Sequence, residues 1–453
     1  MAPKNRLGTE KISSLVWKIA IPSMLAQFVS VLYSIVDRIY VGNIPQVGDL
    51  ALAGIGVCGP IVTMIGAFSF WIGTGGAPQM SIKMGEGNPK EAKKILSNCL
   101  LLLAIFSAVI TAVVLLIKKP MLYLFGASDA IYPYAVKYFT IYASGTVFAL
   151  MSQGLNQFII GQGSAKAGML SVVIGAVMNI ILDPIFIFVL HMGVEGAALA
   201  TIMSQACSML FVLWFLLKKT DIKLSLGGYE WKIMSKVLLL GTTPFLIISL
   251  DNVMIISLNS LLQHYGGAAK GDILLTTNAI VQSFILVMTM PLSGISAGTQ
   301  SILSFNFGAR QTKRVLSAQK YITAMCVGYC TIMFVGARLL GPQFVRMFTR
   351  DPEITAQAIR AIKISTLMAI PLGVQYEIVD GFTAMSLVRY SLPLSLFRKA
   401  VYFLCVFTLP VLLGIENIFY ADPISDIISP IVSTTLYFLV MKKVLRKREE
   451  GLI

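Results

Sequence analysis

Two polar residues inside one apolar stretch are the first that could do chemistry. Asn179 and Asp183 are four residues apart, so on a helix their side chains lie on the same face. Pro184 follows directly and has no N–H, which leaves the carbonyl of Ile180 unpaired and bends the helix. A carboxylate, an amide and a loosened carbonyl on one face are suited to bind a proton or a sodium ion. The alternative is that Asp183 only caps a helix that ends early.

Two further residues could join this pair. Asp37 lies near the outer end of the first apolar segment, and Thr201 offers a hydroxyl at a depth similar to that of Asp183. Charged groups at that depth are costly, so each is a functional hypothesis. An interfacial ion pair with Arg38 is the alternative role of Asp37. The predicted ion-binding residues are Asp37, Asn179, Asp183 and Thr201.

Other polar side chains could contact a substrate. Gln153 and Asn156 share a helix face at a spacing of three, and Asp251 and Asn259 face roughly the same way two turns apart. Two further acids, three residues apart, would repel each other, so one of them should hold a proton or a cation near neutral pH. The predicted substrate-binding residues are Gln153, Asn156, Asp251, Asn259, Glu377 and Asp380.

The elements that carry these residues are long apolar segments. Of 453 residues, 56% are hydrophobic and 13% are charged, about half the charged share of a soluble domain. A bilayer admits helices or closed barrels, and a spanning helix needs about 20 apolar residues, whereas barrel strands alternate over about ten. The unbroken runs predict an all-α polytopic membrane protein of about 12 transmembrane helices. The segments lie near residues 15–40, 50–74, 95–117, 134–158, 168–190, 194–217, 235–262, 273–296, 319–341, 358–384, 394–414 and 424–444.

The basic residues predict the orientation of the chain. It has 36 Lys and Arg against 21 Asp and Glu, a net charge of +15. If both termini lie inside, 25 of the 36 basic residues fall on inside segments, a count that includes Arg398 and Lys399, as the positive-inside rule expects. We therefore predict a multi-pass protein of a bacterial or archaeal plasma membrane with both termini cytoplasmic. The bilayer accounts for the charge, and no nucleic acid partner is expected.

The two halves of the chain resemble each other. Pro22 and Pro244 are 222 residues apart, and an offset of 223 relates the loops 161–166 and 384–389. The same offset of 223 relates Gly75, Ser81 and Gly85 to Gly298, Ser304 and Gly308. Six helices per repeat is an even number, so the repeats run parallel, and transporters with internal repeats bind substrate between them. The predicted units are an N-terminal six-helix lobe, a cytoplasmic connector and a C-terminal six-helix lobe, at residues 1–217, 218–236 and 237–453.

Patterns of catalytic and metal sites are missing from the sequence. It has no phosphate-binding loop ending in Gly-Lys, no HExxH and no GxSxG. Its six cysteines lack CxxC spacing, and His191 and His264 fall at predicted loops. We expect no enzyme activity, no metal and no cofactor, with H⁺ or Na⁺ as the coupling ion.

Several stretches together resemble the multidrug and toxic compound extrusion (MATE) family. They are spread over the whole chain, at residues 36–42, 161–166, 179–186, 193–201 and 298–309. The resemblance implies two lobes in a V around a central cavity, and export of amphipathic, often cationic compounds in exchange for H⁺ or Na⁺. It implies functional roles for Asp37, Gln153, Asn156, Asn179, Asp183 and Thr201. Some branches of the family instead couple through acids on the seventh and tenth helices, which here are Asp251, Glu377 and Asp380.

The expected function is therefore ion-coupled antiport. A monomer in the lipid bilayer would export small amphipathic, cationic drugs or toxins by alternating access. A flippase for lipid-linked oligosaccharides or other lipids shares this architecture, but should carry a more cationic cavity than the acids and amides of the first half. A major-facilitator carrier should show Gly-x-x-x-Asp-Arg in the loop 81–90, which is absent. The alternative from a different class is a membrane-embedded enzyme or receptor, against which the repeat argues.

Overall fold

The computed structural model describes residues 5–452, which form helices and turns without a strand in that range. The helices of the first half are α1 (Arg6–Thr9), α2 (Ile12–Gly42), α3 (Gly48–Gly85), α4 (Pro89–Leu124), α5 (Tyr132–Ser144), α6 (Thr146–Gly161), α7 (Ala165–Pro184), the π turn η1 (Ile185–Val189) and α8 (Val194–Lys218). Those of the second half are α9 (Trp231–Gly308), α10 (Thr312–Leu339), α11 (Gly341–Arg346), α12 (Pro352–Ser365), α13 (Ala369–Ala384), α14 (Val388–Leu413), the 3₁₀ helix η2 (Ile415–Tyr420) and α15 (Ala421–Glu449).

Ten helical stretches in the described range are long and apolar enough to cross a bilayer, and α12 with α13 makes an eleventh, bent by 50°. Each coincides with a segment expected from the sequence, which confirms an all-α polytopic membrane protein. The expected segment 134–158 is instead divided between α5, of 13 residues, and α6, of 16 residues. The division falls at Gly145, where a Cβ atom would collide with the side chain of Ile202 in α8. Close packing of α8 therefore coincides with the interruption.

The longest helical stretch, α9, holds the seventh and eighth expected segments. It runs over 78 residues but changes direction at Gly267, whose φ of 60° suits glycine because no Cβ is present to clash. The candidate spans on either side of this break are Trp231–Gly267 and Ile273–Gly308. Residues near both ends of α9, such as Val237 and Phe305, pack against the second half of α3. The stretch thus leaves one end of the molecule and returns to it.

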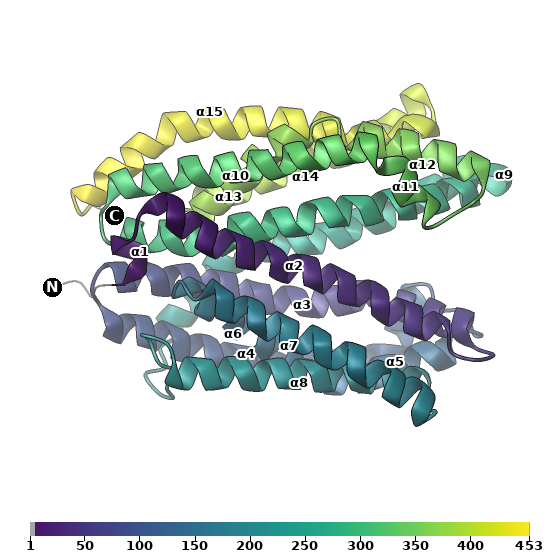
Figure 1. Ribbon diagram of the computed structural model, residues 1–453, viewed down its shortest axis with the longest axis horizontal. Coiled ribbons are helices and arrows are strands. Elements are labelled where there is room, and N and C mark those ends of the chain that lie inside the picture. Colours follow the sequence, from purple (N-terminus) through teal and green to yellow (C-terminus); the bar gives the residue numbers. More distant parts are fainter. Residues whose placement is uncertain (1–4, 453) are drawn as a thin grey trace.

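The helices of the first half of the chain gather on one side of the molecule and those of the second half on the other (Figure 1). Helix α1 and the C-terminal end of α15 lie at the same end of the bundle in this view (Figure 1). We call it the terminal end. The limits of the predicted lobes, 1–217 and 237–453, stay a prediction, and residues 1–4 and 453 lie outside the described range.

Equivalent contacts in the two halves confirm the parallel repeat. The hydroxyl of Ser81 donates a hydrogen bond of 2.5 Å to the carbonyl oxygen of Gly161. The hydroxyl of Ser304 donates one of 2.8 Å to the carbonyl oxygen of Ala384. Both residues of the second bond lie 223 positions after those of the first. In each half, the equivalent serine therefore joins the second membrane segment of that half to the end of its fourth.

The two halves pack backbone to backbone near the terminal end. A Cβ atom on Gly85 of α3 would collide with the carbonyl oxygen of Phe305 in α9. A Cβ atom on Gly308 of α9 would collide with the carbonyl oxygen of Ile82 in α3. These two contacts are related by the same offset of 223 residues. The interface between the halves therefore follows the symmetry of the repeat.

Side chains reinforce this interface. The indole N–H of Trp71 in α3 donates a hydrogen bond of 2.7 Å to a backbone carbonyl of α9, and its ring stacks on Phe245 at 4.4 Å. Glu86 accepts hydrogen bonds of 2.5 Å from Arg448, beyond the middle of α15, and 2.8 Å from Lys83. Partial burial raises the pKa of Glu86, but the two cations outweigh it and hold this pKa below its ordinary value of 4.5. The terminal end is therefore closed by packing and by ion pairs.

Candidate functional site

Two acids predicted from distant segments lie together in the structure. Asp37 lies near the end of α2 and Asp183 near the end of α7, and their carboxyl groups lie close together. Asn179, one turn before Asp183, donates a hydrogen bond of 3.2 Å to its Oδ1 atom. Three of the four residues predicted to bind an ion are thus in contact.

The chain around Asp183 departs from a regular α-helix. Pro184 is the last residue of α7, and the chain continues as a single π turn, Ile185–Val189. Because Pro184 has no N–H, it interrupts the α-helical hydrogen bonds, as the sequence predicted. The wider π turn takes up the change while the span continues to Val189. Such turns inside helices are frequent at functional sites.

Thr201 of α8 reaches the two acids through a residue that the sequence analysis did not identify. Tyr138 of α5 is buried and lies close to Asp37 and to Thr201. The hydroxyl of Thr201 donates a hydrogen bond of 3.0 Å to the carbonyl oxygen of Ala197, which leaves its oxygen free to accept one. Tyr138 is one of 16 tyrosines, and no spacing in the sequence distinguishes it. We call Asp37, Tyr138, Asn179, Asp183 and Thr201 the N-lobe acid cluster.

Three oxygen atoms in this cluster are buried and have no hydrogen-bond partner within residues 5–452: Oδ1 of Asp37, Oδ1 of Asn179 and Oδ2 of Asp183. Asp183 is fully buried and Asn179 nearly so. Buried polar atoms are almost always satisfied, so unpaired ones call for an explanation. A proton shared by the two carboxyl groups, or a sodium ion held by carboxyl and amide oxygens, would satisfy these atoms.

The amides predicted on the fourth segment lie apart from this cluster. Ser69 of α3 donates a hydrogen bond of 3.1 Å to Oε1 of Gln153. Asn156 is buried beside Gly168, and its Oδ1 atom has no partner in the described part of the chain. Gly168 and Asp183 are 15 residues apart on α7, roughly 22 Å along the helix axis. The amides and the acids therefore do not form one site.

The second half holds a group of opposite charges, of which Lys399 and Asp426 are buried and Asp251 and Arg398 half-buried. Asp251 of α9 forms an ion pair with Lys399 of α14. Arg398 donates a hydrogen bond of 2.9 Å from Nε to Oδ1 of Asp426 in α15, and its Nη2 atom lies 2.9 Å from the same oxygen as part of an ion pair. The prediction that Arg398 and Lys399 belong to an inside segment is wrong. Both lie within α14, and each has a carboxylate partner from another helix.

The other predicted contacts of the second half have separate partners. Asn259 accepts a hydrogen bond of 2.9 Å from Asn278 within α9. Glu377 is buried in α13 beside polar side chains of α10. Asp380, three residues later, accepts a hydrogen bond from the hydroxyl of Ser296 in α9. The two acids of α13 therefore lie beside different neighbours.

Comparisons with known proteins agree with this architecture. The MatE family model matches residues 22–185 and 246–407. The multidrug export protein MepA of Staphylococcus haemolyticus is 23% identical over 411 residues, which cover 90% of this chain and 89% of that protein. The FAD transporter of Shewanella oneidensis is 21% identical over 453 residues, covering 98% and 97%.

A solved structure has the same fold over almost the whole chain. It is described as the outward-facing conformation of a multidrug resistance MATE family transporter of the MOP superfamily. Its TM-score is 0.90 at 21% sequence identity, with 98% of this chain and 100% of that chain covered. The two blocks matched by the family model span well over half of the sequence and include most of the acid cluster. This chain therefore belongs to the MatE family of multi-pass membrane transporters.

Proposed function

We propose that this chain exports small amphipathic, cationic drugs or toxins by alternating access, in exchange for H⁺ or Na⁺. The observation that carries the proposal is the N-lobe acid cluster, in which two carboxyl groups from different helices meet with three unpaired buried oxygens. The terminal end would face the cytoplasm, and a monomer in the plasma membrane would suffice.

Ion binding at the cluster supplies a means of moving α2. If Asp37 and Asp183 are both ionised they repel each other, and a proton or Na⁺ between them removes the repulsion and draws α2 toward α7. Along α2, Ser23 packs against Gly294 and Gly298 of the second half. A shift of α2 would therefore reach the interface between the halves. One charge that crosses 100 mV supplies about 2.3 kcal/mol, enough for roughly a fiftyfold gradient.

The charges of the second half support a cationic substrate over an anionic lipid-linked one. Its cations Arg398 and Lys399, the first half-buried and the second buried, are each paired with a carboxylate. A flippase for lipid-linked oligosaccharides should carry a more cationic cavity. The carboxylate partners offset the positive charge of Arg398 and Lys399, and Glu377 and Asp380 add two more acids to the second half.

Dye efflux from proteoliposomes tests the proposal. A fluorescent cationic dye is loaded, and efflux is driven by a proton gradient alone and by a sodium gradient alone. Asp183→Asn should lower gradient-driven efflux at least tenfold without loss of protein yield, because the amide neither binds a proton nor carries the charge that pairs with Na⁺. Asp129→Asn, at an exposed acid in the turn after α4, is the matched control and should keep the activity of the unmodified protein. Unchanged efflux in Asp183→Asn would refute coupling at this cluster.

A further inference from the structure

A cavity of about 470 Å³ lies at the terminal end of the first half, between α1, the start of α2, the turn from α6 to α7 and the end of α8. Its charged lining comprises four bases and one acid: Arg6, Lys18, Lys166, Lys219 and Asp221. Lys18 and Asp37 are 19 residues apart on α2, roughly 28 Å along the helix. The cavity is therefore separate from the N-lobe acid cluster. We call it the terminal basic cavity.

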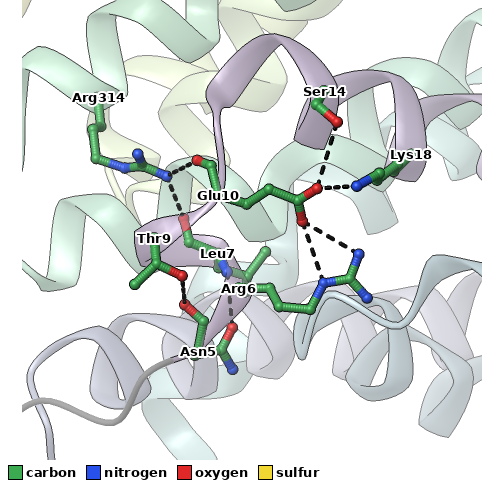
Figure 2. Close-up of polar contacts among 8 residues, drawn as sticks. All are labelled: Asn5, Arg6, Leu7, Thr9, Glu10, Ser14, Lys18 and Arg314. Carbon is green, nitrogen blue, oxygen red and sulfur yellow. Dashed lines mark hydrogen bonds and ion pairs between the residues drawn. The ribbon is translucent and has the colours of Figure 1, made fainter.

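The positive charge of this cavity is only partly neutralised. Glu10 pairs with Lys18 and, at 3.3 Å, with Arg6 (Figure 2). The hydrogen bond from Lys18, assisted by Arg6, holds the pKa of Glu10 below its ordinary value of 4.5, so Glu10 is ionised at neutral pH. Lys166 and Lys219 form no ion pair with a carboxylate of residues 5–452, and both are exposed. The excess of positive charge favours an anionic ligand.

The walls of the cavity are fixed by buried hydrogen bonds. Gln162 donates a bond of 3.2 Å to the carbonyl oxygen of Ile222 and accepts one of 2.8 Å from its N–H. Asn5 donates a bond of 2.9 Å to the carboxylate of Asp221. These bonds join the turn between α6 and α7 to the connector, and the connector to α1. The site therefore exists before a ligand arrives, which lowers the entropic cost of binding.

Part of the lining is apolar. Leu15, Ile19, Ala167 and Phe215 line the cavity beside the bases. Two exposed tryptophans lie close in sequence to lysines of the lining. Trp17, next to Lys18, is 58% exposed. Trp214 is 45% exposed, and its ring centroid lies 5.9 Å from the Nζ atom of Lys219. Tryptophan side chains favour the level of lipid headgroups. Charge and apolar surface together fit an amphipathic molecule rather than a free ion.

From this juxtaposition we infer that the terminal basic cavity binds the phosphate group of an anionic phospholipid from the adjacent leaflet. Lys166 and Lys219 pair with the phosphate, and Phe215 with Leu15 contacts the first carbons of the lipid. The first turn of α7, which also lines the cavity, places the positive end of a helix dipole beside the phosphate. Because α1 and α2 contribute Arg6 and Lys18, a bound lipid also holds the segment that joins them.

The competing explanation is that these bases only orient the chain in the membrane. Bases that act through the general surface potential should be interchangeable with others at the same end. Lys232 and Lys236 supply the comparison, because both are exposed at the start of α9 and lie outside the cavity lining. A specific site requires Lys166 and Lys219 and tolerates loss of the other two.

Binding of short-chain lipids to the purified full-length protein in detergent tests the inference. The probes are dioctanoyl phosphatidylglycerol, dioctanoyl phosphatidylcholine and inorganic phosphate, and bound molecules are counted by native mass spectrometry. Phosphatidylglycerol should bind the Lys166→Gln/Lys219→Gln variant about 25-fold more weakly, about fivefold for each lysine removed. Lys232→Gln/Lys236→Gln should bind it as the unmodified protein does. If the first variant does not fold, Arg6→Gln, from a different element, should weaken binding about fivefold.

Three results would overturn the inference. Equal affinity of both double variants for phosphatidylglycerol would mean that the charges act only through the surface potential. Equal affinity of the unmodified protein for phosphatidylcholine would exclude selection for anionic lipid. Binding of inorganic phosphate as tight as that of phosphatidylglycerol would indicate a soluble anion instead of a lipid.

Discussion

Arg398 and Asp426 illustrate, at the scale of single residues, how this chain holds charge among its membrane helices. Two nitrogen atoms of the guanidinium group each lie 2.9 Å from the same carboxylate oxygen, and Asp426 is 4% exposed. Desolvation of both groups is costly, and their attraction offsets that cost only while both are present. Loss of one partner therefore leaves the other as an uncompensated buried charge.

Asp426→Asn should lower the free energy of unfolding by about 3–5 kcal/mol, because Arg398 loses its carboxylate. The fraction of monodisperse protein that survives heating in detergent measures the change. The double variant Asp426→Asn/Arg398→Gln should recover most of the loss. Glu450→Gln is the control, since it breaks an exposed pair with Arg446 at 2.8 Å and should cost under about 1 kcal/mol. Equal losses for Asp426→Asn and Glu450→Gln would contradict this account.

At the scale of elements, α1 depends on its neighbours. It has four residues, too few to satisfy its own backbone groups. The side chain of Asn5 accepts a hydrogen bond of 2.9 Å from the N–H of Leu7. Arg314 of α10 donates bonds of 3.0 Å to the carbonyl of Leu7 and 2.8 Å to that of Glu10 (Figure 2). Since Asn5 also bonds to Asp221, α1 connects the two halves of the chain.

Arg314→Gln should release α1 from the second half. Hydrogen bonds from a charged donor contribute roughly 1.5–3 kcal/mol each, and less where solvent reaches the donor, so two of them should cost about 2–4 kcal/mol. Trypsin should then cleave after Lys11 at least tenfold faster, because the undocked population rises by that factor or more. Cleavage products identified by mass spectrometry give the rate. Lys313→Gln, at an exposed neighbour of Arg314, is the control and should leave the cleavage rate unchanged. Faster cleavage in both variants would contradict a specific role of Arg314.

Hydropathy predicted the position of the elements but not their interruptions. Apolar runs mark where helices cross the bilayer, because length and composition are local properties. The break at Gly145 coincides with contact with Ile202 in another helix, and such contacts are not encoded locally. The site divides in the same way. Asn179 and Asp183 meet because they are one turn apart, whereas Tyr138 reaches the cluster only through the packing of α5 against α8.

For the whole molecule, the decisive feature is the closed interface at the terminal end. Gly85 and Gly308 occupy equivalent positions in the repeat, and each lies against a backbone carbonyl of the opposite half. Alternating access requires this interface to form in one state and to separate in the other. Each contact joins a glycine to a backbone carbonyl, and neither group is a side chain that could move aside. Added volume at either glycine must therefore push the two halves apart.

Gly85→Val and Gly308→Val should therefore both favour a state in which the terminal end is open. Overpacking of a close contact costs roughly 1–3 kcal/mol, which shifts the balance between the two states by about 5- to 150-fold. Amide hydrogen exchange should accelerate in residues 80–86 and 303–309 in both variants, and dye efflux should fall. Gly328→Val is the matched control: it adds the same side chain within a helix, but no atom lies within 4 Å of its Cβ position. Because the two glycines are equivalent by the repeat, a large effect in one variant and none in the other would contradict a symmetric interface, even if efflux is lost.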